Sequence, residues 1–390
     1  MKKYLAVLVY VLTWGNVQAQ ETYKVSIDLN GVVNDQLPIE IKVPEITEDV
    51  VEYHMAKVVP GTYSISDFGR FVTDFKALTS DGRELEVSVL GSGRNIYRIE
   101  EATALHTITY NVHDTFDETP GYSENYIFEP GGTSIEAERN VFVLNTFGFV
   151  GYIDGMKFIP YEVTILHDES IYGATSLSRS YSDATTDTFV ADNFNFLADA
   201  PIMYCEPDTV TNQIAGAEII VAVHSPNDVV TSKDIMDNIY NMMVAQSKYL
   251  GGELPVDRYA YLVYLLDYST LSSAWGALEH SYSSLYTLPE GNPEDLAQSV
   301  RDVAAHEFLH IVTPLNIHAE EIHNFNYIEP EMSQHLWLYE GVTEYSSMHV
   351  QVRYDLYDRE QFLAEIKEKL SVADQFPSGV SFTEKLISHR

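Results

Sequence analysis

The sequence lacks the features that would cross-link a chain covalently or carry its mature form across a membrane. Cys205 is the only cysteine among 390 residues, so an intrachain disulfide bond is excluded. We expect this residue to be a small buried side chain without a catalytic role. Beyond the N-terminal region no stretch is long and apolar enough to span a bilayer, and internal repeats are missing. With 45% hydrophobic residues the chain can still bury substantial cores, and its length favours two or three domains.

Positive charge is scarce. Lysine and arginine together number 23 against 58 aspartates and glutamates, which gives a formal net charge of −35. Such a chain would repel a phosphate backbone, so nucleic-acid binding is excluded as a function class. The negative field would favour cationic peptides and free amino termini, although salt screens it beyond about 8 Å. A plain role in solubility explains the charge equally well.

The first residues have the pattern of a leader. Lys2 and Lys3 precede an apolar run over residues 5–12, and Val17-Gln18-Ala19 stands before Gln20. This pattern predicts a secretory signal peptide over residues 1–19, and the run is short for the alternative, a membrane anchor. No cysteine follows where a lipid would be attached. We expect an exported protein, periplasmic or extracellular, with no membrane span in its mature chain.

The residues after the leader, 20–208, are rich in strand signals. Short segments of alternating polarity are separated by Gly, Asn, Asp and Pro, for example at residues 23–29, 83–89 and 106–112. This spacing predicts an N-terminal domain built as an antiparallel β-sandwich. Carbohydrate-binding modules share this appearance, but the segment contains no ligand motif that we can defend.

A second domain is predicted over residues 209–390. Residues 217–224 predict a strand, Thr231 or Ser232 caps a helix that runs to about Leu250, and two glycines end it. The expected fold is therefore α+β and multidomain, with the sandwich packed closely on the second domain and a cleft near their junction.

The most informative motif is His306-Glu307-Phe308-Leu309-His310. Residues i and i+4 lie on one face of a helix, so two imidazoles can bind one zinc ion. Glu307 would lie beside the metal, where it can take a proton from the attacking water and pass it to the leaving amine. The alternative is an amphipathic helix in which these residues fall together by chance. A metallopeptidase with one Zn2+ per chain is the leading hypothesis.

The residues around this motif predict a helix. Asn292 is a good N-cap and Pro293 suits the first helical position, whereas Pro314 marks the stop. Apolar residues recur at helical spacing at Val300, Val303, Ala304, Phe308 and Ile311. Both histidines would then lie in the last two turns.

A third zinc ligand has to come from further along the chain. The long metzincin pattern is excluded because Thr313 and Asn316 stand where it requires Gly and His. Glu329 has a spacing close to that of several thermolysin-like enzymes, but it precedes Pro330 and is therefore biased out of helical geometry.

Glu340 is the preferred third ligand. It lies thirty residues after His310, between apolar neighbours suited to a buried helix. Glu344 follows one turn later and could hydrogen-bond the outer nitrogen of a ligating histidine. The alternative for Glu344 is an ordinary solvated surface acid.

The segment Gly276-Ala277-Leu278-Glu279-His280 follows an apolar run over residues 261–266. In thermolysin-like enzymes an edge strand beside the zinc helix aligns the substrate backbone by strand addition. Gly276 and Ala277 would take part in that pairing. Glu279 could bind a free α-amine, because burial of this charged group needs a paired anion.

Together these motifs resemble the glycyl aminopeptidases, a family of gluzincin metallopeptidases. The family pattern comprises Gly-x-x-Glu-His, His-Glu-x-x-His and Trp-x-x-Glu-Gly segments, which residues 276–280, 306–310 and 337–341 match. Residues 60–63 and 67–72 also look like the family's N-terminal Pro-Gly-x-Tyr region. The resemblance spans most of the mature chain.

The resemblance implies a β-rich domain followed by a thermolysin-like zinc peptidase domain. It carries over His306, His310 and Glu340 as zinc ligands, Glu307 as catalytic base and Glu279 as amine anchor. The expected partners are peptides with a free N-terminus, and the expected preference is for small N-terminal residues such as Gly or Ala. The resemblance also places Tyr63 and its neighbours at the border of the cleft, and ordinary packing is the stronger interpretation from the residues themselves.

The chain departs from the family at its C-terminal end. The sequence stops at Arg390, so we expect the C-terminal helical part to be truncated and the family's PDZ domain to be missing. The tyrosine that stabilises the oxyanion in related enzymes would lie beyond this point. The remaining candidates for that role, for each of which packing is the stronger interpretation, are Tyr345, Tyr354 and Tyr357. A zinc endopeptidase and a catalytically incomplete homologue that binds peptides or glycans therefore stay as alternatives.

Overall fold

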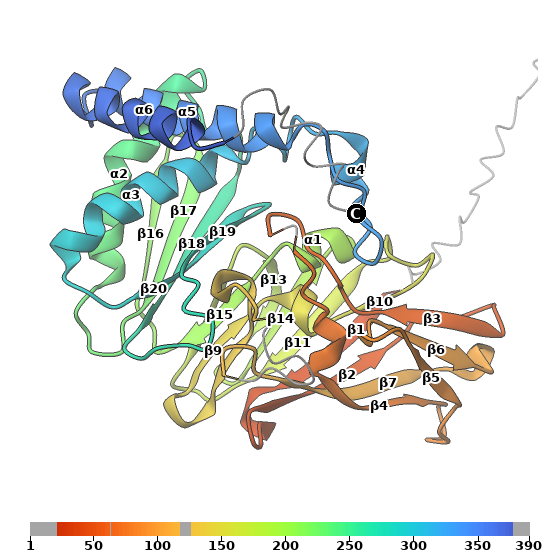
Figure 1. Cartoon of the computed structure of the whole chain (residues 1–390). Coiled ribbons are helices and arrows are strands. Elements are labelled where there is room, and N and C mark those ends of the chain that lie inside the picture. The colour runs from red at the N-terminus through yellow and green to blue at the C-terminus, as the bar shows by residue number, and fades with distance from the viewer. Residues whose placement is uncertain (1–21, 63, 118–125, 377–390) are drawn as a thin grey trace, which may run out of the picture.

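The computed structural model describes residues 22–62, 64–117 and 126–376. The predicted signal peptide and Tyr63 lie outside these residues. Within them, β-sheets fill the N-terminal half, and helices cover a mixed sheet in the C-terminal half (Figure 1). The predicted α+β class is confirmed. The boundary between residues 208 and 209 stays a prediction.

The largest sheet has seven strands in the order β13 (Ser178–Ser182), β14 (Thr186–Ala191), β11 (Tyr161–Leu166), β1 (Tyr23–Asp28), β2 (Gln36–Lys42), β7 (Thr107–His113) and β4 (Val72–Leu78). The strands β1 and β7 match the segments predicted at 23–29 and 106–112. The sheet departs from a purely antiparallel sandwich at one pair, because β1 runs parallel to β11 with Tyr23 opposite Tyr161.

Two four-stranded sheets pack with it. One contains β10 (Tyr152–Ile153), β3 (Val50–His54), β6 (Ile96–Glu100) and β5 (Val87–Leu90), and the other contains β12 (Tyr172–Thr175), β15 (Ile202–Cys205), β9 (Val141–Leu144) and β8 (Ser134–Glu136). The strand predicted at 83–89 was placed too early, since the ladder begins at Val87. Before it, Glu84 makes only an isolated bridge with Leu78.

The fourth sheet carries the zinc-motif helix. Its order is β16 (Thr209–Ile214), β17 (Ala217–His224), β18 (Arg258–Leu266), β20 (Ser283–Pro289) and β19 (Gly276–His280). The strands β17, β18 and β20 are parallel, and an antiparallel strand closes each edge. The position of β19 at an edge agrees with the sequence prediction.

The central strand β18 is apolar on both faces because both are covered. Tyr261 and Val263 pack toward the helices, whereas Leu262 and Tyr264 pack toward the sheet of β9 and β15. This burial explains the continuous apolar run that precedes the Gly-x-x-Glu-His segment. The shared core on the second face joins the two halves of the chain closely, as expected from the sequence.

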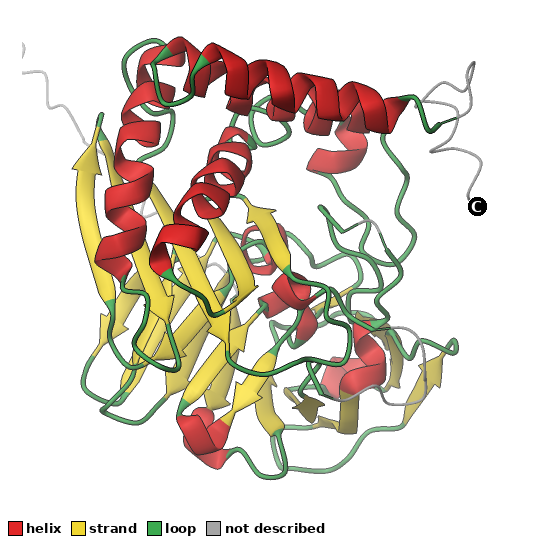
Figure 2. Cartoon of the chain, turned by 60° about the vertical axis from the view of Figure 1, so that its left-hand side comes forward, coloured by secondary structure: helices red, strands yellow, loops and turns green. Residues whose placement is uncertain are grey.

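Helices α2 (Ser232–Tyr249) and α3 (Pro293–Leu309) lie against one face of this sheet (Figure 2). A capping box between Thr231 and Asp234 starts α2, and the Asn292 side chain caps α3. Helix α5 (Leu336–Arg353) packs on α3, and α6 (Arg359–Ala373) packs on α5. The remaining helices are short: α1 (Phe194–Ala198) and α4 (Glu320–His323). Among the described helices, none combines the length and hydropathy needed to cross a bilayer.

The segment 67–72, which the sequence singled out, has a tight backbone contact at Gly69. A methyl group added there would lie 2.1 Å from the carbonyl oxygen of Arg94. The Gly69 N–H donates to the Asn95 side chain at 3.0 Å, and the Tyr97 hydroxyl donates to its carbonyl at 3.3 Å. The glycine therefore allows this segment to pack directly on the start of β6.

Gly69→Ala should lower the free energy of unfolding by about 1–3 kcal/mol, because the methyl group overpacks a backbone contact that cannot yield cheaply. Urea denaturation of both proteins measures the change. Gly291→Ala is the matched control, since its methyl group would meet Leu296 at an ordinary 3.8 Å. Equal losses in the two variants would contradict this account of Gly69.

Cys205 lies on β15 in the core between the two halves of the chain. Burial raises the pKa of its thiol to about 12. Because this pKa lies above the value of an exposed thiol, about 8.5, only the unfolded chain forms thiolate near pH 9. We expect iodoacetamide at pH 9 to label the protein in urea but not the native protein, as measured by mass spectrometry. Fast labelling of native protein would contradict the burial.

Candidate active site

Helix α3 carries His306 and Glu307 in its last turn, and His310 directly follows the helix as its C-cap. His306 is partly buried, and Glu307 and His310 are buried. The buried side chain of Gln246 on α2 donates to the Ala305 carbonyl at 2.8 Å, which fixes this part of α3. The i, i+4 spacing therefore brings both imidazoles to one side of the helix, as the sequence predicted.

The Nδ1 atom of each imidazole forms a hydrogen bond on the outer side of the ring, and the Nε2 atom of each lies toward Glu340. His306 Nδ1 donates to Glu344 Oε2 at 2.8 Å, and His310 Nδ1 donates to the Thr313 carbonyl at 3.0 Å. Both bonds place the proton on Nδ1 and leave the Nε2 lone pair for a metal. The predicted position of Glu344 beside a ligand histidine agrees with this geometry.

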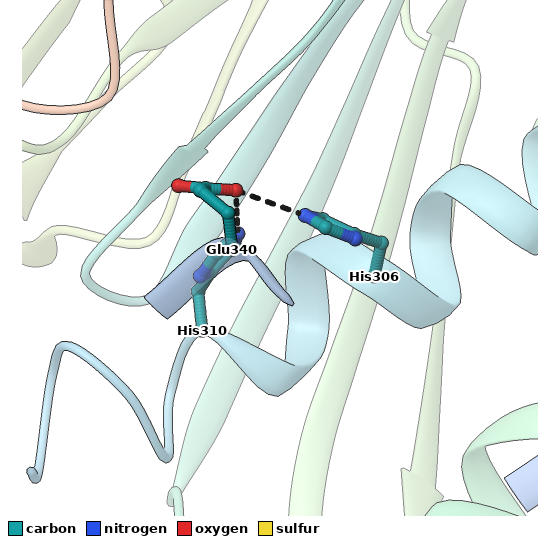
Figure 3. Close-up of side chains that lie close together, drawn as sticks. All are labelled: His306, His310 and Glu340. Carbon is teal, nitrogen blue, oxygen red and sulfur yellow. Dashed lines mark ion pairs between the residues drawn. The ribbon is translucent and has the colours of Figure 1, made fainter. Parts of the chain in front are cut away.

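Glu340 on α5 completes the cluster (Figure 3). Its Oε2 lies 3.4 Å from His306 Nε2 and 3.8 Å from His310 Nε2. Ligand atoms about 2.0–2.2 Å from one tetrahedral zinc ion lie roughly 3.3–3.6 Å from each other. The two measured separations lie close to this range, so His306, His310 and Glu340 could hold one zinc ion as its three protein ligands, with a fourth position for water or substrate.

Glu344 is held from two sides. Its second oxygen accepts from Lys369 Nζ on α6 at 2.6 Å. The hydrogen bond from His306, aided by Lys369, lowers the pKa of Glu344 to about 2. A carboxylate that stays ionised keeps its bond to the imidazole and makes that ring a stronger ligand.

Glu279 reaches the cluster from the edge strand β19. Carboxylate or imidazole atoms of Glu279, Glu307 and His310 all lie within 4.8 Å of one another. Burial raises the pKa of Glu279 to about 8, with a contribution from the charge of Glu340. Burial also raises the pKa of Glu307 to about 7, and the charge of Glu279 adds to this shift. The two acids therefore share a site that favours a bound cation.

The N-terminal half touches Glu279 through the segment 60–62. A methyl group at Gly61 would lie 2.9 Å from Glu279 Oε1 and 2.7 Å from Leu278, and the φ of Gly61 is +81°. Only glycine adopts this conformation without strain while leaving room for the carboxylate. Gly61 therefore packs against Glu279, and it belongs to the segment 60–63 that the family resemblance placed at the border of the cleft.

Gly276 and Ala277, predicted to bind substrate, lie at the start of β19. Gly276 lies three residue steps before Glu279 in this extended strand, roughly 10 Å away. Gly276 faces Phe128, which a methyl group would approach to 3.0 Å, and Ala277 pairs with Tyr286 of β20. The structure thus places these two residues at a distance from the metal cluster, and neither lines the pocket beside Glu279.

The other candidates from the sequence lie outside the cluster. Glu329 is exposed in a loop, where its backbone N–H bonds the Asn326 side chain. The three tyrosines considered as oxyanion donors have ring contacts typical of packing: Tyr345 stacks on His349, Tyr354 lies near Lys248 and Arg353, and Tyr357 lies under Arg301. We assign none of them that role.

Two family profiles match this chain. The Peptidase M61 N-terminal domain matches residues 24–206, and the M61 glycyl aminopeptidase profile matches residues 299–383. Together they cover more than half of the chain, and the second match includes His306, His310 and Glu340. The chain belongs to the M61 peptidase family. This confirms the resemblance found in the sequence.

Solved structures support the fold of this M61 peptidase. An aminopeptidase N family protein from Idiomarina loihiensis superposes with a TM-score of 0.72 and 18% identity over 88% of this chain. The match covers only 56% of that longer protein. A point mutant of an M1 zinc metallopeptidase from Deinococcus radiodurans gives a TM-score of 0.51 with 15% identity, over 92% of this chain and 75% of that one. No curated protein sequence matches this chain.

Glu344→Gln should weaken zinc binding by about 10–100-fold, because the amide is a poorer acceptor for His306 Nδ1–H and leaves the ring less basic. Competition with a chromophoric chelator measures the affinity. The control is Glu329→Gln, which changes an exposed glutamate outside the cluster. Unchanged affinity in the Glu344 variant would show that this carboxylate does not support the metal site.

Proposed function

We propose that this M61 peptidase is a zinc aminopeptidase that removes the N-terminal residue from peptides. The observation that carries the proposal is the position of Glu279 within 4.8 Å of Glu307 and His310. The α-nitrogen of a peptide lies only two bonds from its first carbonyl carbon. A carboxylate this close to the cluster can therefore bind the amine while that carbonyl faces the metal position.

The proposed roles follow from the donor geometry. His306, His310 and Glu340 would hold zinc, which supplies a Lewis acid to polarise the scissile carbonyl and to acidify the attacking water. Glu307 accepts the water proton and delivers it to the leaving amine, a task suited to a pKa of about 7. Glu279 pairs with the α-ammonium group and fixes the position of the first residue.

The segment 60–62 supports an exopeptidase over an endopeptidase. Because Gly61 packs against the Glu279 carboxylate, a peptide with residues before the α-nitrogen would have to displace it. Glycine and alanine, which the family resemblance implies as N-terminal residues, are included among the proposed substrates. A related Deinococcus radiodurans M1 metallopeptidase has been solved with a Tyr-Ser-Ala substrate, and short peptides are the class that we propose here. Export to the periplasm or outside the cell belongs to the same proposal.

Glu279→Gln should raise KM for aminoacyl substrates by about 10–100-fold, because the α-ammonium loses a charge-assisted partner. The assay follows fluorophore release from glycine and alanine amidomethylcoumarins by zinc-loaded protein. Acetylation of the α-amine should slow hydrolysis by the wild-type protein at least as much as the Glu279→Gln substitution slows hydrolysis of the free substrates.

Glu307→Gln is the control for the chemistry and should abolish release from every substrate while zinc stays bound. Equal hydrolysis of free and acetylated substrates would replace the aminopeptidase by an endopeptidase. Zinc-loaded protein that binds peptides but releases no fluorophore would favour a catalytically incomplete binding protein.

A further inference from the structure

A pocket of about 300 Å3 opens beside Glu279 and His310. Its walls come from segments far apart in the sequence, namely Pro60, helix α1, the end of β19 and residues 314–327. Most of the lining residues lie outside the three motifs of the family pattern, which contribute Glu279, His280 and His310. The pocket begins where Glu279 would hold the α-amine, so it is the space into which the first side chain of a peptide would extend.

Asp199 supplies a second carboxylate in this pocket, next to α1. Its Oδ1 lies 3.1 Å from His280 Nδ1, and its Oδ2 accepts from the Ser281 hydroxyl. These two partners directly follow Glu279 in the sequence, so the end of β19 orients both acids. The Asp199 side chain remains 32% exposed, whereas that of His280 is 1% exposed. The carboxylate is therefore fixed in place and still accessible from the pocket.

The basic side chains that line this pocket are four histidines, His280, His310, His318 and His323. Of the residues that line the pocket none is lysine or arginine, and no described lysine or arginine forms an ion pair with Asp199 or Glu279. Lys157 lies nearby, but its Nζ donates to the Phe325 carbonyl at 2.7 Å and lies over the Tyr327 ring. Asp199 already accepts from His280 and Ser281, but its partly exposed carboxylate has further lone pairs that a cation of a ligand can meet.

Five aromatic residues also line the pocket: Phe158, Phe196, Tyr282, Phe325 and Tyr327. Phe158, Phe196 and Tyr282 are all more than a third exposed. Phe196 and Tyr282 stack with centroids 6.5 Å apart and an interplanar angle of 18°. Aromatic faces beside a carboxylate suit a side chain with a long aliphatic stem and a cationic end. Hydrogen or a methyl group would leave such a pocket unfilled.

We propose that this pocket binds the side chain of the N-terminal residue and that Asp199 selects arginine or lysine there, so that the preferred substrates are peptides with a basic N-terminus. This inference rests on the proposed aminopeptidase function, because Glu279 must hold the α-amine for the side chain to enter the pocket. Asp199 is a specificity-determining residue in this view, and the chemistry belongs to Glu307 and the zinc site.

The test compares arginine with citrulline, which has nearly the same shape and no charge. With zinc-loaded wild-type protein, kcat/KM for arginine amidomethylcoumarin should exceed that for the citrulline compound by about 10-fold or more. Asp199→Asn should bring this ratio close to one. Asp192→Asn, at an exposed aspartate outside the pocket, should retain the wild-type ratio. Thermal melting shows whether both variants fold, and if Asp199→Asn does not, the wild-type ratio decides.

The outcomes separate the two proposals. Hydrolysis of alanine or leucine compounds, with arginine no better than citrulline, would overturn the selection by Asp199 and leave the aminopeptidase standing. If no compound is hydrolysed, the proposed aminopeptidase function is contradicted, and binding has to test the pocket separately. Calorimetry with zinc-loaded Glu307→Gln protein then compares Arg-Ala and citrulline-Ala dipeptides. Tighter binding of Arg-Ala by about 10-fold would support the pocket, and equal or no binding would overturn it.

Discussion

Closely spaced negative charge is the constraint on which the active site depends. Glu279, Glu307 and Glu340 converge where α3 ends, and a helix C-terminus is itself partially negative. Two unit charges about 4 Å apart repel by roughly 4 kcal/mol at an effective dielectric constant of 20. This repulsion and burial together raise the pKa values of Glu279 and Glu307. The arrangement is therefore stable when cations enter it, which a divalent metal and a substrate ammonium group would both do.

The fold accommodates two of the acids by placing one at each nitrogen of the His306 imidazole. Glu340 and Glu344 lie one turn apart on α5, so one carboxylate faces Nε2 of His306 and the other accepts from its Nδ1. Lys369 of α6 then neutralises Glu344 from outside. Helices α5 and α6 thus place one acid toward the metal position and compensate the other. The position of α3 depends in turn on β18, whose two apolar faces hold the helices and the sandwich together.

The clustering of the candidate site residues could be predicted from the sequence because helical geometry is local. The spacing of His306 and His310 places both rings on one face, and Glu344 follows Glu340 by one turn. Glu329 could be set aside for a local reason as well, since the residue before a proline is biased away from a helix. Gly61, Asp199 and Lys369 could not be found in this way. Each of them meets its partner through the packing of distant segments, for which a single sequence contains no periodic signal.

The contrast between local spacing and the packing of distant segments also separates the candidate metal ligands from the residues that line the pocket. A metal site demands fixed donors at fixed spacing, so a family motif identifies it in a new chain. The first side chain of a substrate instead meets α1 and residues 314–327, which no motif includes. An expectation of glycine or alanine taken from the family therefore does not extend to these walls. The local acidity of Asp199 and the net charge of −35 both favour cationic peptides, one by direct pairing and the other by attraction over a short range. Solubility alone would account for the overall charge, but not for an oriented carboxylate in an aromatic pocket beside Glu279, the proposed amine anchor.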